Sequence, residues 1–242
     1  MGTMLQKYGL VIGEAPEILN IKEREKIIQI HKKYIEAGAN IITTNTFGAN
    51  NKKLFNSGYI VEDIIEAAVE NAKLASKDKN IAIALDIGPI GELIEPMGTL
   101  SFEEAYNIFQ KQVLQGVKTG VDLILIETMS DLYETKAAIL AAKENCNLPI
   151  FCTMTFEEDG RTFTGCSIPS MVLVLQNLGV DALGVNCSLG PLELEKIVEE
   201  ILKYSQIPIM VQPNAGLPIM IEGKTLYKIT PEECLKSQKR MV

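Results

Sequence analysis

Six short apolar runs, each followed by a stretch with helical periodicity, constrain the fold of this chain most strongly. The runs are rich in aliphatic and β-branched residues and do not alternate with polar ones, as expected of parallel strands buried on both faces. Their ends lie 40, 41, 28, 32 and 26 residues apart, at Thr46, Asp86, Glu127, Thr155, Cys187 and Pro213. Strict alternation of strands with helices predicts a parallel α/β architecture.

The predicted helices carry recognisable start signals. Ser101–Glu104 and Thr230–Glu233 are capping boxes, and Pro231 occupies the first helical position of the second. This last helix is predicted to continue to the end of the chain at Val242. The only histidine, His31, lies within another predicted helix without a partner motif around it, so we interpret it as a packing or surface residue. Helices are predicted over residues 21–37, 61–75, 101–117, 131–144, 169–178, 191–204 and 230–242, whereas residues 1–20 are predicted as a loop or a distorted helix.

A closed barrel is favoured over a doubly wound sheet. No glycine-rich fingerprint of a dinucleotide site is present, and Gly223-Lys224-Thr225 is not a phosphate-binding loop because Pro218 stands where the earlier glycine is required. The length of 242 residues suits one (β/α)8 barrel, which typically has about 250. We therefore predict a single TIM-type domain over residues 1–242.

The composition restricts partners and location. Hydrophobic residues make up 47% of the chain and charged residues 22%, which favours a large core over disorder. The net charge is -8, and the absence of a basic stripe argues against nucleic acid or an anionic membrane as partner. No apolar run is long enough for a membrane span and no signal peptide is recognisable, so a cytoplasmic location is expected. The five widely spaced cysteines do not form a disulfide framework.

Polar residues end each predicted strand, and in a closed barrel these ends converge on the face where barrel enzymes hold their active sites. Two of them, Asp86 and Glu127, are acids after long apolar runs, where a carboxylate is costly unless it meets a cation, an amine or backbone donors. The alternative is that such residues only cap strands at the solvent, and that Cys187 is a small core side chain. A catalytic zinc site needs three protein ligands, and only Cys187 is well placed. The polar ends are Thr44-Asn45-Thr46, Asp86, Glu127-Thr128, Thr155, Asn186-Cys187-Ser188 and Gln212-Pro213-Asn214.

Several of these motifs, taken in order along essentially the whole chain, resemble the homocysteine-binding domain of homocysteine S-methyltransferases. The Asn-Cys-Ser-Leu-Gly-Pro form, together with Pro213-Asn214-Ala215-Gly216, is most similar to the N-terminal module of cobalamin-dependent methionine synthases. The motifs are Met1-Gly2-Thr3-Met4-Leu5-Gln6, Thr43-Thr44-Asn45-Thr46-Phe47-Gly48-Ala49-Asn50, Asp86-Ile87-Gly88-Pro89, Glu127-Thr128 and Val185-Asn186-Cys187-Ser188-Leu189-Gly190-Pro191.

The resemblance implies a zinc site of three cysteines that binds homocysteine as a thiolate, which then accepts a methyl group and becomes methionine. By position, Cys187 matches the first zinc ligand and Glu127 the acid that receives the substrate's amino group. The resemblance places Asn186 beside the metal and implies that it binds the substrate. The further substrate-binding positions implied by the match are Asp86, Asn45 and Thr46.

Two departures from the family pattern accompany these matches. The strand that ends in Asp-Gly-Ala before Met1-Gly2-Thr3 is absent, and so is the Gly-Gly-Cys-Cys-Gly-Thr stretch that supplies two zinc ligands. We therefore expect a barrel without strands 1 and 8, truncated at both ends, with exposed strand edges at residues 40–46 and 208–213. Cys166 is the nearest candidate for a substitute ligand, but zinc would need an adjacent pair and tetrahedral geometry.

Two functions follow as alternatives. The first is a zinc-dependent homocysteine methyltransferase domain of a longer protein, with cobalamin and methyltetrahydrofolate on other modules and with homocysteine as substrate. The second is a non-catalytic barrel remnant, or a binding module completed by a subunit that supplies the missing strands. Another thiol acceptor stays open. In either case we expect residues 1–242 alone to bind zinc weakly and to turn over no homocysteine.

Overall fold

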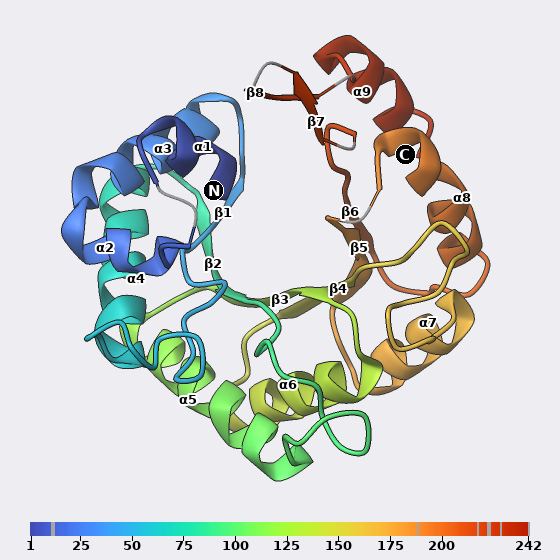
Figure 1. Ribbon diagram of the computed structural model, residues 1–242, viewed down its shortest axis with the longest axis horizontal. Helices are drawn as coiled ribbons and strands as arrows, with labels where there is room; N and C mark the ends of the chain where they lie inside the picture. The colour runs from blue at the N-terminus through green and yellow to red at the C-terminus, as the bar shows by residue number, and fades with distance from the viewer. Residues whose placement is uncertain (11–12, 188, 217, 222–223, 228, 242) are drawn as a thin grey trace. The chain divides into compact units, whose positions relative to one another are not determined.

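A six-stranded sheet, in which the order of strands in space is their order in the sequence, organises the fold (Figure 1). The computed structural model describes residues 1–10, 13–187, 189–216, 218–221, 224–227 and 229–241. The strands of this sheet are β1 Ile41–Thr43, β2 Ala82–Ile87, β3 Leu123–Met129, β4 Ile150–Met154, β5 Ala182–Asn186 and β6 Ile209–Gln212. A second, two-stranded sheet consists of β7 Pro218–Ile221 and β8 Lys224–Tyr227.

Helices connect the strands of the main sheet, as predicted. The chain divides into two compact units, called here the first unit (Met1–Ile126 with Ala137–Ile150) and the second unit (Glu127–Lys136 with Phe151–Val242). None of the described helices is long and apolar enough to cross a membrane. The helices are α1 Gly2–Lys7, the 3-10 helix η1 Pro16–Ile18, α2 Leu19–Lys22, α3 Arg24–Glu36, α4 Val61–Ser76, α5 Phe102–Thr119, α6 Leu132–Asn145, α7 Ile168–Asn177, α8 Pro191–Leu202 and α9 Pro231–Gln238.

In the first unit, β2 pairs in parallel with β1 on one side and with β3 on the other. The central strand β2 is almost entirely buried, which explains its uninterrupted apolar run. Helix α3 places Ile27 and Ile30 against Leu5 of α1, so the apolar stripe of α3 is covered by the start of the chain. The predicted capping box at the start of α5 is confirmed, since the Ser101 side chain and the Glu104 backbone and side chain bond reciprocally.

In the second unit, β5 lies between β4 and β6 and pairs in parallel with both. All residues of β5 are buried. Gly184 of β5 is paired with Met210 of β6, and a Cβ atom at Gly184 would overlap the Met210 carbonyl oxygen. The glycine therefore permits a backbone approach between these strands that a larger residue would prevent.

The structure differs from the sequence-based expectations at both ends of the chain. The segment predicted as a loop or a distorted helix contains α1, η1 and the start of α2, and the helix predicted over residues 21–37 is divided between α2 and α3. Strands β7 and β8, which pair antiparallel, were not predicted, because Pro213, Gly216 and Pro218 lie close together there and favour a loop. Helix α9 has the predicted capping box but ends at Gln238, and Val242 lies outside the described residues.

Candidate active site

The carboxyl end of β3 presents an acidic side chain. Glu127 is partly buried, and burial raises the pKa of its carboxyl group. The next residue, Thr128, has φ 62°, a left-handed conformation that is a genuine outlier for a β-branched side chain. A carboxylate in this position gains most from a cationic partner, such as the amino group of a small substrate.

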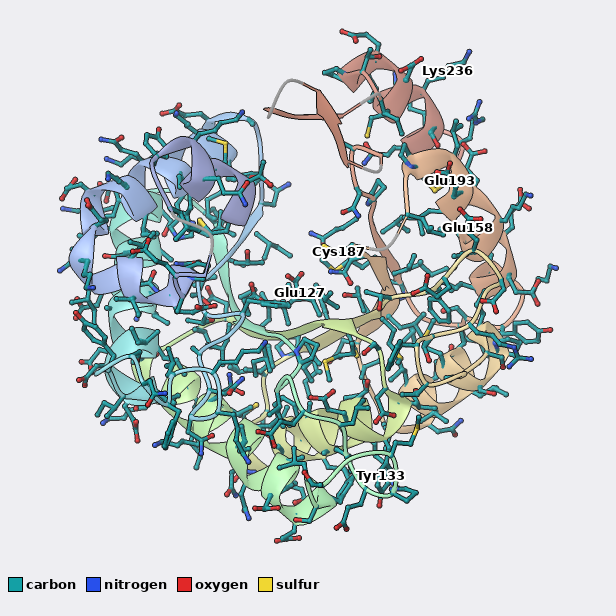
Figure 2. All side chains as sticks on the ribbon, in the orientation of Figure 1. Glu127, Tyr133, Glu158, Cys187, Glu193 and Lys236 are labelled. Carbon is teal, nitrogen blue, oxygen red and sulfur yellow. The ribbon has the colours of Figure 1, made fainter. Side chains whose placement is uncertain are left out.

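The carboxyl end of β5 presents a thiol. Cys187 is exposed and also has a left-handed backbone, with φ 56°. Its N–H donates to the carbonyl oxygen of Gln212 in β6 at 3.2 Å. Figure 2 shows the side chains of Glu127 and Cys187 on the side of the second unit's strands that faces away from helices α7 and α8. Within this unit, the carboxyl group and the thiol are therefore presented on the same face.

Asn186 connects the end of β5 to β4 and to the end of β3. Its Oδ1 accepts hydrogen bonds from the Thr128 N–H at 3.0 Å and from the Thr153 hydroxyl at 2.9 Å. Its Nδ2 donates to the Thr128 hydroxyl at 2.8 Å. The side chain is buried, with only 1% of its surface exposed. Asn186 thus joins β5 to β4 and to the end of β3.

In the first unit, two buried threonines hold the backbone of Asp86. The Asp86 N–H donates to Thr44 Oγ1 at 3.1 Å, and Thr46 Oγ1 donates to the Asp86 carbonyl oxygen at 2.7 Å. The two hydroxyl oxygens lie 2.7 Å apart. Thr46 is fully buried, so its hydroxyl fixes the end of β2.

Asn45 connects the end of β1 to the N-terminal segment. Its Nδ2 donates to the Pro16 carbonyl oxygen at 2.7 Å, and its own carbonyl oxygen accepts from Asn20 Nδ2 at 2.7 Å. The nearby Gly48 N–H donates to the buried carboxylate of Glu17 at 2.7 Å. This network fastens residues 16–20 beside the carboxyl end of β1.

The described residues do not fit a complete zinc site. No three His, Cys, Asp or Glu side chains gather among them where they could hold one metal ion. Cys152 is buried within β4, and burial raises the pKa of its thiol. Burial and the Asp131 charge also raise the pKa of Cys166. Neither cysteine forms a group of three potential ligands with Cys187 among the described residues, and a catalytic zinc site has three protein ligands.

The structure brings the six residues singled out from the sequence into two groups. Asn45, Thr46 and Asp86 lie together in the first unit, and Glu127, Asn186 and Cys187 lie at strand ends of the second. Their roles in binding stay predictions. Sequence analysis named Thr128 as a polar strand end without giving it a role and did not single out Thr153, because no residue pattern indicates their hydrogen bonds to Asn186.

A parallel sheet whose strands end in an acid, an amide and a thiol defines a barrel-type α/β protein with chemistry at its strand ends. The sequence model of the homocysteine S-methyltransferase family matches residues 1–242. The chain belongs to this family of methyltransferases.

Curated relatives and a solved structure support this assignment. The chain is 30% identical to the methionine synthases of Mycobacterium leprae and Mycobacterium tuberculosis, over 96% of its own length but only 21% of theirs. It therefore spans about a fifth of the length of these relatives. The metallated form of the homocysteine methyltransferase MmuM from Escherichia coli matches with a TM-score of 0.80 and 20% identity, covering 89% of this chain and 82% of that one. This likeness confirms the predicted TIM-type fold, of which six parallel strands are described.

Proposed function

We propose that residues 1–242 form one domain that binds homocysteine and presents its sulfur for methylation. The observation that carries this proposal is the pair of side chains at the strand ends of the second unit, the Glu127 carboxyl and the Cys187 thiol, in a member of this family. Glu127 would receive the substrate's ammonium group. Asp86, Asn45 and Thr46, which lie together in the first unit, are proposed as further substrate-binding residues.

In the reaction, the homocysteine sulfur attacks the methyl carbon of the donor. A new sulfur–carbon bond forms, the bond between methyl and donor breaks with its electron pair left on the donor, and the thiol proton passes to solvent. Cys187 is the one zinc ligand that we assign to this chain. Because the described residues do not complete a zinc site, no step is attributed to the metal.

The methyl donor would lie on other parts of a longer protein. The chain spans 21% of the length of the methionine synthases that it resembles, which leaves room for further modules. We propose cobalamin, recharged by methyltetrahydrofolate, as the group that such modules carry.

The assignment of Glu127 is tested by titrating the 242-residue chain with L-homocysteine in a calorimeter, with Zn²⁺ present, above the raised pKa of Glu127. Replacing Glu127 with glutamine removes the charge that pairs with the ammonium group. The dissociation constant should then rise by about 10- to 100-fold, the usual effect of losing a charge-assisted hydrogen bond. Glu158→Gln, at an exposed position of the same unit, is the control and should bind like the parent chain. Equal binding by the parent chain and Glu127→Gln would remove Glu127 from the site.

A further inference from the structure

We propose that Asn186 is a positioning residue, which holds Thr128 and through it Glu127 in place and does not itself contact the substrate. This inference rests on the proposed function, because it concerns how the substrate-binding carboxyl group is held. It also changes the role that the family resemblance implied for Asn186, which was direct substrate binding.

The hydrogen bonds of Asn186 leave its amide little capacity for a ligand. A side-chain amide has two donor hydrogens and two acceptor lone pairs. Both acceptor positions and one donor position of Asn186 are used by Thr128 and Thr153. Only 1% of the residue is exposed, so a substrate has almost no surface to meet. The amide therefore acts on neighbouring protein groups.

The bonds to Thr128 stabilise a backbone conformation that threonine rarely adopts. Thr128 has φ 62°, and strained conformations persist only where the surroundings fix them. Asn186 contacts Thr128 at two points, the backbone N–H and the side-chain hydroxyl. That N–H belongs to the peptide group between Glu127 and Thr128. Holding this peptide group therefore also fixes the main-chain orientation of Glu127, from which its side chain projects.

The position of Asn186 in the sequence adds a second connection. The following residue is Cys187, whose left-handed backbone is held by its N–H bond to Gln212. The side chain of Asn186 thus fixes the residue after Glu127, while its main chain leads directly into Cys187. The buried amide of Asn186 thus determines how the Glu127 carboxyl group and the Cys187 thiol are placed relative to each other.

The test compares Asn186→Ala with the parent 242-residue chain in three measurements: hydrogen exchange of the Thr128 amide, NMR titration of the Glu127 carboxyl carbon, and the dissociation constant for L-homocysteine. Loss of the hydrogen bonds from Asn186 should speed exchange of the Thr128 amide by about tenfold or more, the scale of one hydrogen bond. It should also move the titration midpoint of Glu127 down toward that of an ordinary glutamate and weaken homocysteine binding.

The matched control is Asn71→Ala in the first unit. Asn71 is also a buried asparagine, and its Nδ2 donates to the Asn20 carbonyl oxygen at 2.9 Å. Both substitutions should lower stability, but only Asn186→Ala should change Thr128 exchange and the Glu127 midpoint. If both measurements in Asn186→Ala match those in Asn71→Ala, the inference is wrong.

A second pair of variants covers the case in which Asn186→Ala does not fold. Thr128→Val keeps the shape but loses the hydroxyl, and Thr128→Ser keeps the hydroxyl. The valine variant should shift the Glu127 midpoint and the serine variant should restore it; equal midpoints would overturn the inference. If the parent chain binds no homocysteine, the proposed function fails, but the exchange and titration results still decide the role of Asn186.

Discussion

At the scale of the single residue, His31 shows that burial in the first unit disfavours a charged side chain. It lies in α3 with 2% of its surface exposed, and burial lowers its pKa from 6.5 to about 4. The charge of the chain's amino terminus acts in the same direction. Of the two interpretations that the sequence left open, a packing residue or a surface residue, the structure shows the first. Protonation of this buried side chain is a source of acid sensitivity.

We predict that stability falls as the pH is lowered from about 6.5 to 4. In this range the unfolded chain binds a proton at His31 and the folded chain does not, so protons favour unfolding. The free energy of unfolding is unaffected by this group above pH 6.5. Near pH 4 it is lower by about 3 kcal/mol, because the unfolded chain has then taken up the proton. Urea unfolding of the parent chain and of His31→Gln at pH 7.0 and 4.5 measures it. The parent should lose more stability than the variant, and equal losses would contradict the prediction.

At the scale of the element, β5 is positioned by its contact with β6 as much as by its apolar side chains. All five residues from Ala182 to Asn186 are buried. The glycine in the middle of the strand accommodates the Met210 carbonyl oxygen. Since Asn186 and Cys187 follow directly, the approach of these two strands determines where the thiol is presented.

Replacing Gly184 with alanine should therefore disturb both stability and site. The added methyl group meets backbone rather than a movable side chain, and such overpacking typically costs about 1–3 kcal/mol. Chemical unfolding should show this loss, and the Cys187 N–H should exchange faster because its bond to Gln212 crosses the same pair of strands. Gly2→Ala, where a Cβ atom meets nothing within 4 Å, is the control. A Gly184→Ala chain as stable as the control would refute this account of the strand pair.

Most elements could be predicted from the sequence because their causes are local. Apolar runs mark the six parallel strands, and Ser101 and Thr230 with their glutamates mark two helix starts. The β7–β8 pair and the left-handed backbone at Thr128 depend on partners distant in the sequence. For the same reason the sequence indicated that Asn186 belongs to the site but not that its amide bonds to protein groups.

At the scale of the whole molecule, the chain divides into two compact units, and each contains three of the residues singled out from the sequence. In the first unit, threonine hydroxyls hold the Asp86 end of β2, and in the second unit Glu127 and Cys187 lie at strand ends. The family model matches residues 1–242. Among the described residues, however, no three possible metal ligands gather, and Cys187 is the only one that we assign. We therefore expect this chain to recognise the substrate but not to retain a metal ion.

We predict that the purified 242-residue chain does not retain zinc through mild chelation. One cysteine at the strand ends cannot provide the three protein ligands that a stable catalytic site requires. Metal analysis after dialysis against a weak chelator should find far less than one zinc per chain, and Cys187→Ser should change that value little. Stoichiometric zinc that survives dialysis and disappears in Cys187→Ser would show that ligands outside the present assignment complete the site.

The hydrogen bonds around Asn186 should also affect how fast this asparagine deamidates as the protein ages. Asparagine deamidates when the backbone nitrogen of the next residue attacks the side-chain amide carbon, which requires both groups to move toward each other. Here Thr128 and Thr153 hold the amide, and the nitrogen of Cys187 is engaged with Gln212. The bonds that organise the site should therefore also slow its spontaneous decay, so that on prolonged storage Asn186 keeps its amide longer than exposed asparagines of the same chain.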